Sequence, residues 1–478
     1  MSLTTARRRP DAPRRGLLPC LILLTSLGAL DQTMMATALP DVLADLGSPE
    51  RAGWPVTAYT LALTATMPAA GALGDRLGRR RALLAALTLF CLASLACGLA
   101  GDLTVLTCAR LVQGVGGAGL LALPQAVVAD AVPVRDRAAY LGPLGAVFAV
   151  ATVVSPLLGG WLTDAASWRW IFWVNLPLGA AAAALVGTVV PALPAGRARR
   201  TRFDARGAAL LALTAGALTL ATARTGGPGW TVAAAGATVL AVAVTVWWER
   251  RAADPVLPLR VLGRRTVRLC CGLALLAGFG LFGVLAYVPA WIQAGWGTSA
   301  STAGLMLLPV TVGIVVGTNA SGLAVRRWGH WRLFPVAGCA LSAAAATGLA
   351  ALGGWVPPLV LVAGLLAVMA LGIGLFMQLV VVAAQAAGPR EATGKITATL
   401  GFVRETGVLT GTALLGSLAV HSLAAAPGRA AVTAFTPVFA VTAACFACAL
   451  VLALLLPSHR LGPPARDGEK REVAPAKD

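Results

Sequence analysis

The chain has 478 residues, of which 58% are hydrophobic and 12% charged, with a mean hydropathy of +0.80. This composition excludes a water-soluble globular protein and is typical of an integral membrane protein. The formal net charge of +19 would suggest a nucleic acid partner, but the positions of the basic residues indicate a different origin for the charge.

Fourteen apolar stretches follow one another along the chain, each about the 20 residues that cross roughly 30 Å of hydrocarbon as a helix. We therefore expect an all-α, multi-pass protein of the cell membrane with fourteen spans. They are 17–40, 54–74, 82–101, 104–128, 139–162, 170–193, 207–224, 230–248, 267–292, 303–323, 333–352, 357–383, 397–420 and 433–456.

The basic residues lie mostly on one side of this arrangement. If both ends of the chain are cytoplasmic, 32 of the 38 Lys and Arg residues fall in cytoplasmic segments and four fall outside. This is the positive-inside asymmetry of membrane proteins. It predicts that both termini are cytoplasmic and that the basic clusters 7–15 and 197–206 serve to fix the orientation of the spans in the membrane. It also argues against a nucleic acid partner. No cleavable signal peptide is evident, so we expect the first span to remain in the protein.

The sequence predicts no disulfide, metal site, cofactor or catalytic domain. All nine cysteines lie within the spans, and the three histidines are far apart. The segment 388–396 departs from a phosphate-binding loop, because it has one residue too many before Gly394 and no Ser or Thr after Lys395. We therefore expect neither an enzyme nor a protein that uses ATP.

A repeat in two loops predicts the domain organisation. Gly71 and Gly78 follow the second span, Gly322 and Gly329 follow the tenth, and the two pairs are 251 residues apart. This spacing predicts two parallel six-helix halves. The expected domains are an N-terminal half (1–193), a linker with two extra spans (194–266), a C-terminal half (267–456) and a cytoplasmic tail (457–478).

Asp31 lies well inside the first apolar stretch, and Arg110 lies within the fourth. An ionised side chain in hydrocarbon costs several kcal/mol, so each is a functional-site hypothesis by default. We interpret Asp31 as the group that carries a proton.

The loop after the second span resembles the glycine-rich loop motif of the major facilitator superfamily. The motif matches at Gly71, Leu73, Asp75, Arg76, Gly78, Arg79, Arg80 and Leu83. The resemblance implies the two-halved transporter fold, in which this loop acts as a conformational latch. Asp75 could hold the halves together through charge-assisted hydrogen bonds.

Further segments resemble the fourteen-span drug:proton antiporter branch of that superfamily, namely 30–40, 106–118, 168–179 and 203–207. The resemblance implies that Arg110 faces the central cavity, near the proton path. The antiporter motif of the fifth span is present as Pro156, Gly159 and Gly160, but Ser155 and Ala151 replace two usual glycines. The departure weakens antiport relative to uniport or symport without overturning it.

Four residues of the C-terminal half are candidates for binding substrate: Gln378, Gln385, Arg404 and Glu405. Gln378 and Gln385 are seven apart and share one helix face, where hydrogen bonding between helices is an equal alternative. Arg404 and Glu405 point about 100° apart on a helix, so we expect that they do not neutralise one another and that one lines the cavity. The alternative is a boundary charge that reaches the membrane surface.

Together these features predict a proton-coupled antiporter that exports amphipathic drugs or antibiotics. Its partners would be a small amphipathic substrate, protons and the lipid bilayer. The alternatives are a dedicated exporter of one endogenous metabolite and a transporter-like membrane receptor that moves nothing.

Overall fold

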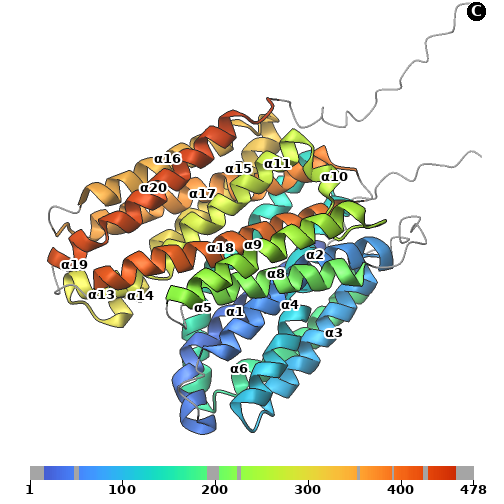
Figure 1. Ribbon diagram of the computed structural model, residues 1–478, viewed down its shortest axis with the longest axis horizontal. Coiled ribbons are helices and arrows are strands. Elements are labelled where there is room, and N and C mark those ends of the chain that lie inside the picture. Colours follow the sequence, from blue (N-terminus) through green and yellow to red (C-terminus); the bar gives the residue numbers. More distant parts are fainter. Residues whose placement is uncertain are drawn as a thin grey trace, which may run out of the picture.

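The computed structural model describes residues 16–47, 53–190, 204–222, 228–352, 356–389, 392–423 and 429–458, and every regular element in these ranges is a helix. The basic clusters at 7–15 and 197–203 and the tail beyond residue 458 lie outside the described residues. Figure 1 shows the helices packed side by side, as expected where the bilayer offers the backbone no hydrogen-bond partner.

Two groups of helices and an inserted pair follow in chain order. The N-terminal bundle consists of α1 (Leu17–Leu46), α2 (Trp54–Leu77), α3 (Arg79–Gly98), α4 (Leu103–Ala131), α5 (Val134–Ala165), α6 (Trp170–Trp173) and α7 (Asn175–Val189). The inserted pair is α8 (Ala205–Thr222) and α9 (Pro228–Arg251), followed by the short α10 (Leu259–Leu262).

The C-terminal bundle begins with a broken helix. It consists of α11 (Arg265–Ala277), the π-helix η2 (Gly278–Phe282), α12 (Gly283–Leu285), α13 (Val288–Trp296), α14 (Ala300–Leu305), α15 (Leu308–Trp328), α16 (Leu333–Ala351), α17 (Leu359–Ala387), α18 (Thr393–Leu423), α19 (Arg429–Ala434) and α20 (Thr436–Leu454). The inserted pair lies where the bundles meet, because α8 contacts both α2 and α18 (Figure 1).

Glycine allows the closest helix contacts in both bundles. A Cβ on Gly114 of α4 would lie 2.4 Å from the carbonyl oxygen of Tyr59 in α2, and one on Gly317 of α15 would lie 2.5 Å from that of Leu371 in α17. Small residues at such crossings are the usual basis of helix packing in membranes.

Each of the fourteen predicted stretches coincides with helix in the described residues. Nine described helices are long and apolar enough to cross a membrane, or ten when a pair in α5 bent by 48° counts as one span. The count of fourteen crossings therefore stays a prediction, as does the division into domains. The two repeat glycines, Gly78 and Gly329, both end helices at positive φ, 86° and 74°.

The stretch 267–292 is not one regular helix as the sequence suggested. It is interrupted by η2 and by a turn before α13. A Cβ on Gly278 would lie 2.2 Å from the carbonyl oxygen of Arg404, so the glycine-rich η2 lies directly against α18. Single π-turns of this kind are frequent at functional sites.

Candidate functional site

Asp31 is buried in the N-terminal bundle and holds three hydrogen bonds. Its carboxylate accepts from Arg110 Nη1 at 2.5 Å, Gln113 Nε2 at 2.9 Å and Asn175 Nδ2 at 3.0 Å. Asp31 is 3% exposed and Arg110 is 0% exposed. The site joins α1, α4 and α7, and it brings together the two intramembrane charges that the sequence singled out. A buried pair of this kind is most stable when its remaining polar atoms are also bonded, and Arg110 Nη2 has no hydrogen-bond partner among the described residues.

The surroundings of Arg110 extend this network to α2. Arg110 Nη1 also donates to Gln113 Oε1 at 2.8 Å, and the guanidinium carbon lies 4.1 Å from the centroid of the Tyr59 ring. Tyr59 in turn donates to the carbonyl oxygen of Gly28 in α1. Arg110 is 0% exposed and pairs with Asp31 inside the N-terminal bundle, so the position facing the central cavity that the resemblance implied stays a prediction.

Sequence reasoning missed Gln113, Asn175 and Tyr59 as parts of this site. Gln113 could have been found, because it lies three residues after Arg110 on the same helix face. Asn175 and Tyr59 carry no such local signal. Asn175 is 144 residues away from its partner Asp31 in the sequence, and Tyr59 lies on a different helix from Arg110.

The predicted latch connects the two bundles at what we call the loop end, the end of the molecule at which residues 71–81 lie. Asp75 of α2 accepts hydrogen bonds from the backbone nitrogens of Gly394 (3.0 Å) and Lys395 (2.9 Å) in α18. These are free donors at a helix N-terminus, where negative charge is favoured. Arg79 completes the group by pairing with Asp75 at 2.5 Å and with Asp130 of α4 at 2.6 Å.

The other residues of the predicted latch lie in different surroundings. A Cβ on Gly71 would lie 2.4 Å from the carbonyl oxygen of Gly394, so only glycine fits between α2 and α18 there. Gly78 provides the positive φ that ends α2. Arg76 pairs with Asp254, beyond the inserted helices. Arg80 lies next to Gly187 of α7 and is half-buried.

The motif residues of the fifth span lie in α5. A Cβ on Gly159 would come 2.6 Å from Thr37 Oγ1, so this glycine allows α1 and α5 to pack closely. Gly160 has open space around it. The 48° bend between 136–151 and 154–165 falls about one turn before Pro156, as a proline kink does.

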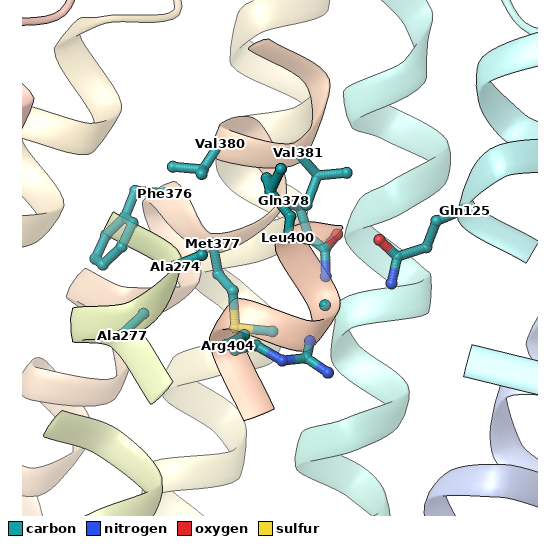
Figure 2. A pocket seen from close by; sticks show the side chains of 11 residues that line it. Gln125, Ala274, Ala277, Phe376, Met377, Gln378, Val380, Val381, Leu400 and Arg404 are labelled. Atoms are coloured by element: carbon teal, nitrogen blue, oxygen red, sulfur yellow. The ribbon is translucent and has the colours of Figure 1, made fainter. Parts of the chain in front are cut away.

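A pocket between the bundles contains two of the substrate candidates (Figure 2). It is lined by Gln125 of α4, by Ala274 and Ala277 of α11, and by residues of α17 and α18 that include Phe376, Met377, Gln378 and Arg404. Gln378 and Arg404 are 3% and 8% exposed, and Gln378 Oε1 and Arg404 Nε have no hydrogen-bond partner. The guanidinium of Arg404 lies 4.8 Å from the ring centroid of Phe148 in α5.

Arg404 and Glu405 do bond to one another, at 2.8 Å from Nη2 to Oε1. The expectation that they do not neutralise one another is therefore wrong, because the long arginine side chain reaches the neighbouring carboxylate. Both residues are buried, so neither is a boundary charge that reaches the membrane surface. Arg404 lines the pocket, and Glu405 is not among the lining residues that the described chain provides.

Gln385 lies apart from the pocket and connects helices. Its Nε2 donates to Thr397 Oγ1 of α18 at 2.9 Å and to the carbonyl oxygen of Gln125 in α4 at 3.4 Å. Of the two interpretations of Gln385, the geometry favours hydrogen bonding between helices.

The sequence pattern of the Major Facilitator Superfamily matches residues 21–412. The chain belongs to this superfamily. The membership predicted from the 71–83 loop is therefore confirmed.

The relatives include one that is named as a multidrug transporter. Two uncharacterized MFS-type transporters of Mycobacterium tuberculosis, from strains CDC 1551 / Oshkosh and H37Rv, are each 40% identical over 423 residues, 87% of this chain and 61% of theirs. The chain thus spans about three fifths of the length of these relatives. The multidrug transporter protein MdtP of Bacillus subtilis is 29% identical over 415 residues, 85% of this chain and 76% of its own.

Solved superfamily members have the same fold. The human organic anion transporter MFSD10 superposes with a TM-score of 0.66 at 17% identity, over 91% of this chain and 100% of its own. The proton:xylose symporter XylE superposes with a TM-score of 0.64 at 14% identity, over 92% and 98%. At these identities the likeness concerns the fold alone.

Proposed function

We propose that this superfamily member is a proton-coupled antiporter that exports amphipathic drugs or antibiotics from the cell. The observation that carries the proposal is the enclosed pair of Asp31 and Arg110, which places a titratable group within the helix bundle next to a fixed cation. The name of the multidrug transporter protein MdtP supports the choice of substrate. The excess of Lys and Arg supports a cytoplasmic position for the loop end and for both termini.

The lining of the pocket between the bundles matches an amphipathic substrate. Its cavity of about 30 Å³ is far below the roughly 300–1,000 Å³ of a drug-sized site, so in this proposal the pocket widens before substrate binds. Phe376 and Met377 offer apolar surface, while Gln378 Oε1 and Arg404 Nε are buried polar atoms without partners. Binding pockets for small molecules typically combine apolar walls with a few polar groups. In this proposal, such a substrate gains hydrogen bonds at the two atoms that the empty pocket leaves unbonded.

Helix α2 is the physical connection between the proton site and the latch. It carries Tyr59, which lies under Arg110, and Asp75, which caps α18. Protonation of Asp31 removes the charge that holds Arg110, and the released guanidinium changes its contact with Tyr59. Because α2 is one continuous helix, this shift is transmitted to the loop end, where the bundles separate for the substrate to exchange.

The closed loop end fits one state of such a cycle. Asp75 with Gly394, Gln385 with Gln125 and Arg326 with Asp136 all join the bundles there. In this proposal the structure represents the state in which the cytoplasmic side is closed.

Transport in everted membrane vesicles tests the proposal. With a proton gradient established, addition of substrate should release protons from the lumen in wild-type vesicles and in Asp41→Asn, a control at an exposed position of the same helix. Asp31→Asn should accumulate no substrate. Substrate accumulation without proton movement would exclude antiport, and binding without any accumulation would favour the membrane receptor.

A dedicated exporter of one endogenous metabolite is distinguished by its range of substrates. A pump-deficient host that expresses the chain should become resistant to several unrelated amphipathic compounds if the drug exporter is right. Resistance to none of them, with export of a single cell product, would identify the dedicated exporter.

A further inference from the structure

The segment that follows the inserted helix pair, residues 252–258, lies across the junction of the two bundles. Its Asp254 contacts Arg76 of α2 through one carboxylate oxygen and Lys395 Nζ of α18 through the other, the latter at 2.5 Å. Lys395 Nζ also donates to the carbonyl oxygen of Pro255 at 2.8 Å. One short segment thus binds a cation from each bundle.

An apolar cluster fixes the same segment in place. Val256 is 1% exposed and packs with Ala69 of α2 and Leu211 of α8, while Phe402 of α18 covers the cluster. Helices from both bundles and from the inserted pair therefore meet around one residue of this segment. Burial of these apolar side chains favours this position of the segment.

A buried carboxylate at the end of α9 sets the path of the segment. Glu249 is 2% exposed, and its Oε2 accepts a hydrogen bond from the backbone nitrogen of Leu257 at 3.0 Å. The segment is thereby tied at one end to the inserted pair, at its centre to the apolar cluster, and through Asp254 to both bundles.

We propose that residues 252–258 form a clip that holds the two bundles together at the loop end, with Asp254 as its positioning residue. Loss of the carboxylate would remove the anion that Arg76 and Lys395 share. The clip supplements the cap that Asp75 places on α18, because Lys395 belongs to both contacts: its backbone to Asp75 and its ammonium to Asp254. This gives the inserted pair a function in transport, namely to stabilise the closed loop end.

Hydrogen exchange of the full-length protein in lipid nanodiscs tests the clip. The amides of Gly394 and Lys395 are protected by Asp75 only while the loop end is closed. Asp254→Asn removes the charge from two charge-assisted contacts, and we expect these amides to exchange about tenfold faster, equivalent to about 1.4 kcal/mol. Asp254→Glu, which keeps the charge, should restore most of the protection.

A matched control is a second ion pair between the bundles, Arg326 with Asp136, whose side chains are 61% and 38% exposed. Because exposed pairs contribute little, Asp136→Asn should change exchange at Gly394 and Lys395 by about twofold at most.

The pairing itself is tested by combining variants. Lys395→Gln should accelerate exchange at Gly394, and Asp254→Asn in the Lys395→Gln background should add much less than it does alone, because the two side chains act as one contact. Unchanged exchange at Gly394 in Asp254→Asn, or fully additive effects, would overturn the clip. The measurement needs neither substrate nor a proton gradient, so its outcome is separate from that of the antiport proposal.

Discussion

Replacement of Asp31 by asparagine tests whether the enclosed charge pair is a functional device or a structural support. The substitution keeps the size of the side chain but removes the negative charge that Arg110 Nη1 contacts at 2.5 Å. It also brings an NH₂ group toward Gln113 and Asn175, whose amides already donate to the carboxylate. The variant therefore loses an ion pair, and its new NH₂ group faces other hydrogen-bond donors instead of an acceptor.

The expected loss of stability follows from the burial of the partner. Arg110 is 0% exposed, so it cannot recover hydration when its partner is neutralised. Breaking a buried pair in this way costs about 3–5 kcal/mol. With an unfolding entropy of about 2.1 cal/mol/K per residue, the 478-residue chain should unfold at a temperature lower by about 3–5 °C.

Thermal unfolding of the purified protein in detergent measures this shift, and the double variant Asp31→Asn/Arg110→Gln is the informative comparison. Because it removes both charges, its stability should return to within about 1–2 °C of wild type. Transport, in contrast, should be absent in both variants, since neither retains a titratable carboxyl group at position 31.

Either of two results would refute the reasoning. If Asp31→Asn unfolds at the wild-type temperature, the pair does not have the strength that its burial implies. If the double variant recovers both stability and proton-driven accumulation of substrate, Asp31 is a structural residue and the proton is carried elsewhere.

Asp75→Asn should weaken the cap on α18 by about 1–2 kcal/mol. Because Asp75 is not among the residues that line the pocket, turnover should fall while substrate affinity is kept. A large loss of affinity at normal turnover would contradict this. Glu405→Gln should remove the negative charge that pairs with Arg404 beside the pocket. Export of cationic compounds should then fall more than export of neutral compounds of similar size. Equal effects on both would make Glu405 a structural residue. Reporter fusions at Gly196 and after Pro463 should give cytoplasmic signals, whereas an external signal at either site would overturn the count of spans. A hydrogen bond from Arg169 lowers the pKa of Asp45. The ionised Asp45 therefore stabilises the fold fully above about pH 4, and this contribution is lost as the pH falls further. The unfolding temperatures of wild type and Asp45→Asn should converge in acid, and a constant difference would exclude this linkage.

The sequence by itself determined the class of the protein, because that class depends on local properties. An apolar run of about 20 residues in a bilayer has to satisfy its backbone internally, so it forms a helix wherever it occurs in the chain. Likewise, the glycines and charges of residues 71–83 are close neighbours in the sequence, and their spacing alone indicated the superfamily.

Only the tertiary structure decided which side chains meet. Asp31 and Asn175 are 144 residues apart, and Asp254 and Lys395 are 141 residues apart. The rotation of each helix about its axis selects such partners, and that rotation depends on packing against every neighbour. For the same reason the sequence could not show that Arg110 is enclosed within the N-terminal bundle, or that Arg404 lines the pocket while it bonds to Glu405.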